Sequence, residues 1–159
     1  MARPLDTARL GDHLDRLYRA ACALTGSRLT ADDLVQETYA RVLSRPRKIR
    51  NEDDLGYLLR TMRNVFLDQY RTAKRRATDP TDPEDLDRIV QGSGPQEAVE
   101  HRELLAAISA LPEDFRDVIV AVDVTGLSYK ETADLLKVPE GTVMSRLYRA
   151  RKRLIERVG

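Results

Sequence analysis

Residues 128–157, SYKETADLLKVPEGTVMSRLYRARKRLIER, contain the pattern that decides the fold. Ser128, followed three residues later by Glu131, forms a capping box that marks the start of a short helix. The stretch 138–141 then predicts a tight turn, because its proline and glycine interrupt helices. A longer helix follows to the end of the chain. A short capped helix, a tight turn and a longer second helix are the parts of a helix-turn-helix.

The second helix of this motif has two distinct faces. Apolar residues at helical spacing predict a buried stripe: Val143, Leu147, Ala150 and Leu154. The same spacing turns another set outward: Met144, Ser145, Tyr148, Arg149 and Lys152. Flanking cations are suited to phosphate contacts: Arg146, Arg151, Arg153 and Arg157. Serine and arginine hydrogen-bond base edges, and tyrosine packs on a base, so the pattern favours DNA binding. The alternative is a solvated basic helix at the end of a bundle.

The remaining sequence is also helical in pattern, and strand signals are almost absent. In the N-terminal half a first helix runs from about Leu10 to a C-cap at Gly26, and a second begins with Thr30 as its N-cap. A third starts near Asn51 or Glu52 and continues to about residue 76. The sequence therefore predicts an all-α N-terminal bundle.

The C-terminal half contains two helices before the helix-turn-helix. One is expected over residues 96–109, and a second is expected to open with Pro112 at its first helical position and to end at Gly126. Together these helices predict a second small bundle.

A composition break separates the two halves. Residues 77–95, ATDPTDPEDLDRIVQGSGP, are rich in proline, glycine and acids, which is typical of a linker. The chain is near neutral overall, with 27 Lys and Arg against 26 Asp and Glu, but the linker region is acidic and the N-terminal half is basic. We predict two helical bundles joined by a flexible acidic linker, with domains 1–76, 77–96 and 97–159.

Composition excludes several classes of protein. No apolar stretch approaches the length of a membrane span, and charges interrupt the start of the chain where a signal peptide would be apolar, so a cytoplasmic location is expected. One cysteine and two histidines are too few for a structural zinc site. Cys22 is interpreted as a small core residue. No catalytic set or nucleotide-binding glycine pattern is present, so we expect no enzyme activity, cofactor, metal or small-molecule substrate.

Two stretches of the N-terminal half resemble conserved region 2 of bacterial RNA polymerase sigma factors. They are ADDLVQETY at 31–39 and LLRTMRN at 58–64, the latter continuing through DQYR at 68–71. Three stretches of the C-terminal half resemble region 4: LPEDFR at 111–116, GLSYKE at 126–131 and GTVMSRLYRAR at 141–151. The two regions occur in the family's order, and the short length is similar to that of the extracytoplasmic-function (ECF) subgroup of the sigma-70 family.

This resemblance implies a promoter-specificity subunit of RNA polymerase. The region 2 helix would bind the clamp helices of the largest polymerase subunit through Asp32, Asp33, Leu34, Gln36 and Glu37. The basic loop and the next helix would recognise the −10 element through Arg47, Lys48, Asn64, Asp68, Arg71 and Arg75. The −35 element would be read by Met144, Ser145, Arg146, Tyr148, Arg149 and Lys152. The resemblance also implies contact with the flap of the second-largest subunit and control by an anti-sigma factor.

Two other functions remain open on the sequence. A stand-alone regulator would bind an operator as a dimer, without polymerase, and would have no use for the 31–39 helix. An interaction protein of the anti-sigma type would bind polymerase or a sigma factor but not DNA. Charge reversal at Arg149 distinguishes this last class from a sigma factor. If the protein is an interaction protein that does not bind DNA, the substitution would leave promoter recognition unchanged.

Overall fold

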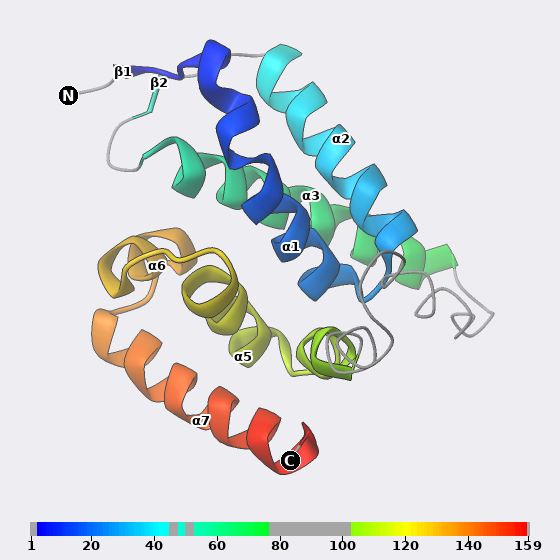
Figure 1. Cartoon of the computed structure of the whole chain (residues 1–159), viewed down its shortest axis with the longest axis vertical. Coiled ribbons are helices and arrows are strands. Elements are labelled where there is room, and N and C mark those ends of the chain that lie inside the picture. The colour runs from blue at the N-terminus through cyan, green and yellow to red at the C-terminus, as the bar shows by residue number, and fades with distance from the viewer. Residues whose placement is uncertain (1–2, 45–47, 50–52, 77–102, 159) are drawn as a thin grey trace.

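The computed structural model describes these residues of the chain: 3–44, 48–49, 53–76 and 103–158. They are almost entirely helical (Figure 1). The described part also contains one antiparallel pair of two-residue strands, β1 (Arg3–Pro4) and β2 (Lys48–Ile49), with Arg3 opposite Ile49. The predicted all-α fold is confirmed, and this short ladder is an addition that helical periodicity does not report.

A 3-10 helix and three α-helices form the N-terminal half: η1 (Thr7–His13), α1 (Leu14–Thr25), α2 (Arg28–Ser44) and α3 (Asp54–Arg76). Helix α1 ends at Gly26, as predicted. The φ of 74° at Gly26 is in the left-handed region, and its N–H donates to the Cys22 carbonyl at 2.8 Å. The helices bury their largest apolar side chains completely: Leu17, Leu34, Leu58 and Met62. This core leaves the outer faces of α2 and α3 in solvent.

Three helix starts in this half differ from the prediction. Helix α1 begins at Leu14 and not near Leu10, because residues 7–13 form the 3-10 helix η1. Helix α2 begins at Arg28, before Thr30, because the Ser27 hydroxyl accepts a hydrogen bond from the Thr30 N–H at 3.4 Å. Ser27, not Thr30, therefore satisfies a free N–H of the first turn. In the same way the Asp53 carboxylate accepts from the Gly56 N–H at 2.8 Å, so α3 starts slightly later than predicted.

The C-terminal half begins with a helical stretch at residues 103–109. It continues with α5 (Glu113–Val118), η3 (Ile119–Val124), α6 (Tyr129–Leu136) and α7 (Glu140–Val158). Residues 96–102 of the first predicted helix lie outside the described residues. Pro112 is the N-cap of α5 and not its first helical residue, and its carbonyl accepts from the N–H groups of Phe115 and Arg116.

The element η3 is a π-helix that the sequence pattern does not predict. The N–H and the hydroxyl of Thr125 both donate to the Val120 carbonyl, at 2.9 and 2.7 Å, so these hydrogen bonds span five residues. Gly126, with a φ of 85°, ends the element as predicted. The π-helix buries Ile119, Val120 and Ala121.

The predicted capping box at the start of α6 is confirmed. The Ser128 hydroxyl accepts from the Glu131 N–H at 3.0 Å, and the Glu131 carboxylate accepts from the Ser128 N–H at 3.2 Å. We expect Ser128→Ala to lower the free energy of unfolding by about 1 kcal/mol, because one helix N–H loses its partner. Urea unfolding followed by circular dichroism measures this. Glu131→Gln is the control, since glutamine still accepts the hydrogen bond. Equal stability of Ser128→Ala and the parent would contradict the assignment.

The two halves pack against each other and share one hydrophobic core within the described residues. Helix α1 contacts η3, and α3 contacts α6. In Figure 1, α1–α3 lie together on one side and α5–α7 on the other. Leu24 and Leu59 of the first half line a void of about 10 Å³ with Val120 and Leu135 of the second. This volume is at the lower limit for one water molecule, so the halves pack closely here, and the charged side chains of Arg63 and Asp117 also line the space.

Candidate nucleic-acid interface

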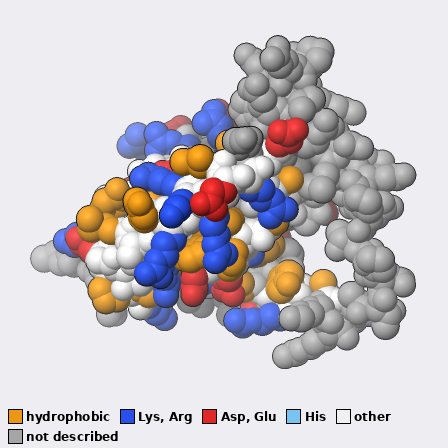
Figure 2. Space-filling model, turned by 90° about the horizontal axis from the view of Figure 1, so that it is seen from below, with side chains coloured by type: hydrophobic (Ala, Val, Ile, Leu, Met, Phe, Trp, Pro, Cys, Tyr) orange, Lys and Arg blue, Asp and Glu red, His pale blue; other side chains and the backbone are white. Residues whose placement is uncertain are grey.

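Helix α7 presents the face that its periodicity predicts. Its inward residues are buried: Val143, Leu147, Ala150 and Leu154. Its outward residues are all exposed: Met144, Ser145, Tyr148, Arg149 and Lys152. Tyr148 is 71% exposed, a large value for an aromatic side chain. Figure 2 looks onto the side of the molecule that carries α7 and shows Lys and Arg side chains interspersed with apolar ones. We call these five outward residues the α7 face.

The turn between α6 and α7 fixes the direction of this face. Lys137 ends α6 in the left-handed conformation, with a φ of 58°, and its N–H donates to the Ala133 carbonyl. The Pro139 carbonyl then accepts from the N–H groups of Thr142 and Val143, at 3.0 and 3.2 Å, and starts α7. A short capped helix, a tight turn and a long second helix are thus present as predicted.

Three cations on the other sides of α7 contact neighbouring elements. Arg151 donates two hydrogen bonds to Asp123 of η3, at 3.0 and 2.6 Å, and this hydrogen bonding raises the pKa of Arg151. Arg153 lies over the Phe115 ring at 4.7 Å. Arg146 is 3.8 Å from an Asp114 carboxylate oxygen. These three arginines brace α7 against α5 and η3, whereas Arg149 and Lys152 point to solvent.

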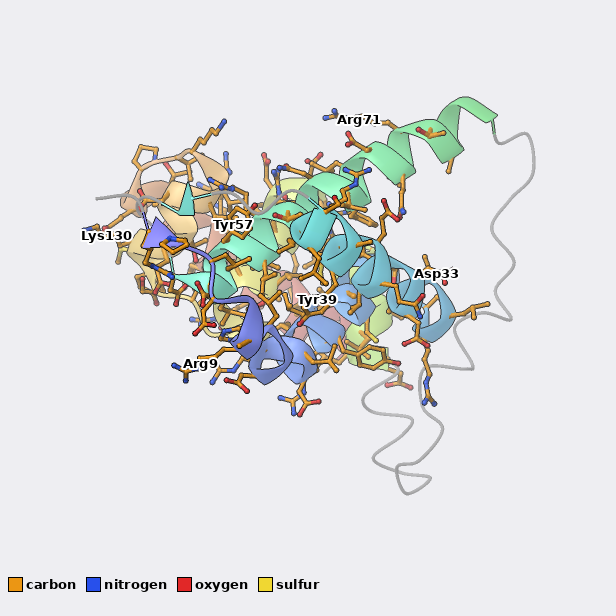
Figure 3. All side chains as sticks on the ribbon, turned by 90° about the horizontal axis from the view of Figure 1, so that it is seen from above. Arg9, Asp33, Tyr39, Tyr57, Arg71 and Lys130 are labelled. Carbon is orange, nitrogen blue, oxygen red and sulfur yellow. The ribbon has the colours of Figure 1, made fainter. Side chains whose placement is uncertain are left out.

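Helix α2 carries the predicted polymerase-binding residues. Asp32, Asp33 and Gln36 are exposed, and Figure 3 shows Asp33 projecting from α2. Glu37 is half-buried and accepts from Arg41 at 3.2 Å. Leu34 is a correction: it is completely buried, so it belongs to the core and offers no contact surface.

The predicted −10 residues are partly described. Asn64, Asp68 and Arg71 are exposed along α3, and Figure 3 shows Arg71 where α3 extends beyond the other helices. Asp68 lies 3.7 Å from Arg41 of α2. Arg47 lies outside the described residues, as do the side chains of Lys48 and Arg75.

A groove of about 690 Å³ lies beside Asn64, and sequence reasoning missed most of its lining: Arg41, Val42, Ser44, Tyr57, Arg60, Thr61, Asn64 and Lys137. Arg60 and Asn64 are one helical turn apart on α3, and the Arg60 guanidinium lies 5.4 Å from the Tyr57 ring. The i, i+4 spacing of Arg60 and Asn64 places both side chains on one face of α3, and this pattern could have predicted Arg60 as a lining residue from the sequence. Lys137 comes from the other half of the chain, so no local pattern could have found it. We call this cavity the α2–α3 groove.

Other kinds of site are not supported by the described residues. Within them, no group of three or more His, Cys, Asp or Glu side chains is placed to hold a metal ion. None of their helices combines the length and the apolar character needed to cross a membrane. Cys22 is buried in the core, and burial raises the pKa of its thiol, which keeps it protonated and unreactive at neutral pH.

A helix-turn-helix with exposed cations on its second helix, packed against a second helical module with a polar, cation-lined groove, defines a protein of two helical modules with a candidate nucleic-acid interface. Comparison with models of known protein families identifies both modules. Sigma-70 region 2 matches residues 10–76, and Sigma-70, region 4 matches residues 101–154. The chain belongs to the ECF family of RNA polymerase sigma factors.

Individual relatives support this membership. The chain is 38% identical over 147 residues to the ECF RNA polymerase sigma factor SigE of Mycolicibacterium smegmatis, covering 89% of this chain and 57% of that protein. It is 33% identical over 135 residues to the ECF sigma factor EcfG of Rhodopseudomonas palustris, covering 84% and 74%. Among solved structures, the sigma factor RpoE in complex with the anti-sigma factor NepR from Bartonella quintana matches with a TM-score of 0.71, at 25% identity, covering 94% of this chain and 93% of that chain.

Proposed function

We propose that this chain binds core RNA polymerase and directs it to promoters by recognising a −10 and a −35 element, without catalysing a reaction itself. The observation that carries the proposal is the α7 face of region 4, which is free of carboxylates and exposed on the helix that a helix-turn-helix inserts into the major groove. Region 2 lies in the same chain. A sigma factor needs both modules together.

The exposed side of α2 is the proposed polymerase contact. Asp32 and Asp33 carry the negative charge there, and Gln36 adds a neutral hydrogen-bonding group one turn further. These side chains do not contribute to the core, unlike Leu34, so they are available to a basic partner surface such as the clamp helices. The flap of the second-largest subunit is proposed to bind region 4.

The two DNA elements would be read by different chemistry. On the α7 face, Arg149 and Ser145 suit base edges in the major groove, and Lys152 suits a phosphate. In region 2, the α2–α3 groove is lined by hydrogen-bonding groups of Asn64 and Thr61 and by the cation of Arg60. Such a groove suits an unstacked base and its backbone, whose capture offsets the few kcal/mol that unstacking costs. Because region 2 and region 4 belong to one chain, binding of one DNA element raises the effective concentration of the other module at its element, so two weak contacts give a stronger overall binding.

Control by an anti-sigma factor is part of the proposal. The RpoE structure was solved with NepR bound, and its fold matches nearly the whole of this chain. An anti-sigma factor that covered the α7 face or the exposed side of α2 would block promoter or polymerase binding.

Run-off transcription with purified core polymerase and a genomic promoter library tests the function. We expect start sites that appear only when this protein is added and that share two spaced upstream elements. Core polymerase with the Gln36→Ala variant, altered on α2 away from the DNA faces, is the matched comparison and should give weaker initiation at the same sites.

Two results would overturn the proposal. Binding of duplex DNA without polymerase at a palindromic site, with no new start site, would assign the protein to the operator-binding regulators. Absence of both activities would assign it to interaction proteins that bind no DNA.

A further inference from the structure

A short segment before α1 is fixed against the rest of the first half. We call residues 3–13, which contain β1 and η1, the N-terminal arm. Leu5 and Leu10 of this arm are buried in the hydrophobic core. The Leu10 carbonyl accepts a hydrogen bond from the Tyr39 hydroxyl of α2 at 2.8 Å. Apolar burial and this hydrogen bond therefore anchor the arm directly after β1.

The ladder between β1 and β2 connects the arm to the loop that precedes α3. Arg3 lies opposite Ile49 and Pro4 lies opposite Lys48 in antiparallel pairing, and Figure 1 shows the two strands side by side. Pro4 suits this place, because its ring favours the extended backbone of an edge strand. Isolated pairs of strands are only marginally stable in water, so a ladder of this length needs support from its surroundings. The burial of Leu5 supplies that support on one side.

An ion pair supports the ladder on the other side. The Arg3 guanidinium donates to the Asp54 carboxylate at 2.8 Å, and the two side chains are 45% and 16% exposed. A carboxylate shielded to this degree is less screened than one in open solvent, so its attraction to the guanidinium is stronger. Asp54 is the first residue of α3. The arm is thus joined both to β2 and to the start of α3.

The loop that the arm contacts is the basic loop of the predicted −10 site. Its residues, 45–53, include four cations: Arg45, Arg47, Lys48 and Arg50. The loop follows Ser44 and ends shortly before Tyr57, and both of these residues line the α2–α3 groove. The covalent connection therefore brings the loop to one end of that groove. Cations there suit the phosphates of a bound strand.

Fixing this loop in advance favours DNA binding. Ordering a loop on binding costs conformational entropy for each residue that becomes fixed, and like charges within one loop repel one another. The arm already holds the backbone of Lys48 and Ile49 in the folded protein, so less of that cost remains when DNA binds. The ion pair with Arg3 also neutralises Asp54, a carboxylate that would otherwise repel phosphates beside the loop.

We propose that the N-terminal arm positions the basic loop for recognition of the −10 element, with Arg3 acting through Asp54 and the ladder and not as a DNA contact itself. The role of the loop in DNA binding rests on the proposed function, whereas the contact between arm and loop is independent of it. Arg3 and Pro4 precede residues 10–76, the part of the chain that matches Sigma-70 region 2. Membership of the family therefore does not supply this role.

A charge exchange between Arg3 and Asp54 tests the contact. Arg3→Glu alone places two carboxylates together, Asp54→Arg alone places two guanidinium groups together, and the double variant restores an ion pair of reversed direction. Hydrogen exchange of the amides in residues 45–53, measured by mass spectrometry on the full chain, should be about tenfold faster in each single variant because the ladder opens locally. The double variant should return to within about twofold of the parent.

The matched control is Arg9→Glu. This variant makes the same charge change in the same arm, but Arg9 pairs with Asp12 inside η1, at 3.3 Å, and not with α3. Its exchange over residues 45–53 should equal that of the parent. Circular dichroism establishes that all variants keep their helices.

Initiation tests the role of the loop. Run-off transcription with core polymerase uses one promoter to which the parent protein directs initiation, with its −10 element intact and then scrambled. On the intact element, Arg3→Glu and Asp54→Arg should each lower initiation about tenfold, because the loop must be ordered on binding. The double variant should restore initiation to within about twofold of the parent, and Arg9→Glu should leave it unchanged.

Several results would overturn the proposal. Exchange in Arg3→Glu as slow as in the parent would overturn the contact between arm and loop. Faster exchange with unchanged initiation would overturn the positioning role. A double variant that regained slow exchange but not initiation would show that Arg3 contacts DNA directly, and higher initiation by Asp54→Arg alone would assign the effect to charge. A parent that directed no initiation would overturn the proposed function, while the exchange rates would still decide whether the arm holds the loop.

Discussion

Replacing Arg149 by glutamine is expected to lower promoter-directed initiation about ten- to a hundredfold while leaving stability almost unchanged. Arg149 is exposed near the middle of the α7 face and, unlike Arg151, has no carboxylate partner in the described part of the chain. A bidentate arginine contact with guanine contributes about 1–3 kcal/mol of discrimination. Run-off transcription from one promoter, with its −35 element intact and then scrambled, measures the effect. The parent should lose activity on scrambling, and the variant should not.

Two neighbours on α7 serve as controls for Arg149. Arg153→Gln removes a cation that lies over Phe115, so it should lower stability by about 0.5–1 kcal/mol and leave promoter choice unchanged. Lys152→Gln should weaken binding to all sequences alike and reduce the slope of log affinity against log salt by about 0.9. If Arg153→Gln reduced initiation as much as Arg149→Gln, the assignment of the α7 face would be wrong.

Replacing Leu34 by alanine is expected to lower the free energy of unfolding by about 2–5 kcal/mol. Leu34 is completely buried between α2 and its neighbours, so truncation removes apolar contacts and leaves a cavity. Gln36, two residues along the same helix, is exposed, and Gln36→Ala should change stability by less than about 0.5 kcal/mol. Urea unfolding measures both variants.

The Leu34→Ala and Gln36→Ala variants are expected to show the opposite order of effects on polymerase binding. At a temperature where both variants are folded, Gln36→Ala should bind core polymerase more weakly, and Leu34→Ala should bind like the parent, because its changed atoms lie inside the protein. Weaker binding by folded Leu34→Ala, with normal binding by Gln36→Ala, would move the polymerase contact away from the exposed side of α2.

Much of the fold could be predicted because its signals are local. The capping box needs only Ser128 and Glu131, three residues apart, and the two faces of α7 follow from the repeat of the helix. Helix starts were predicted less well, because several polar residues near each start can serve as the N-cap, and the structure uses Ser27 and Asp53. The π-helix at η3 has no recognisable local pattern.

The candidate site also has some features that could be predicted from the sequence and others that only the tertiary structure shows. The sequence by itself determined the α7 face and the exposed acids of α2, since both depend on the position of a residue within its own helix. Only the tertiary structure decided that Leu34 is core, that Arg151 is paired with Asp123, and that Arg63 meets Asp117. Helical periodicity shows which side of a helix is apolar, but the partner across an interface is set by packing between segments distant in the chain. The contact of Lys137 with the α2–α3 groove arises only when the two halves dock.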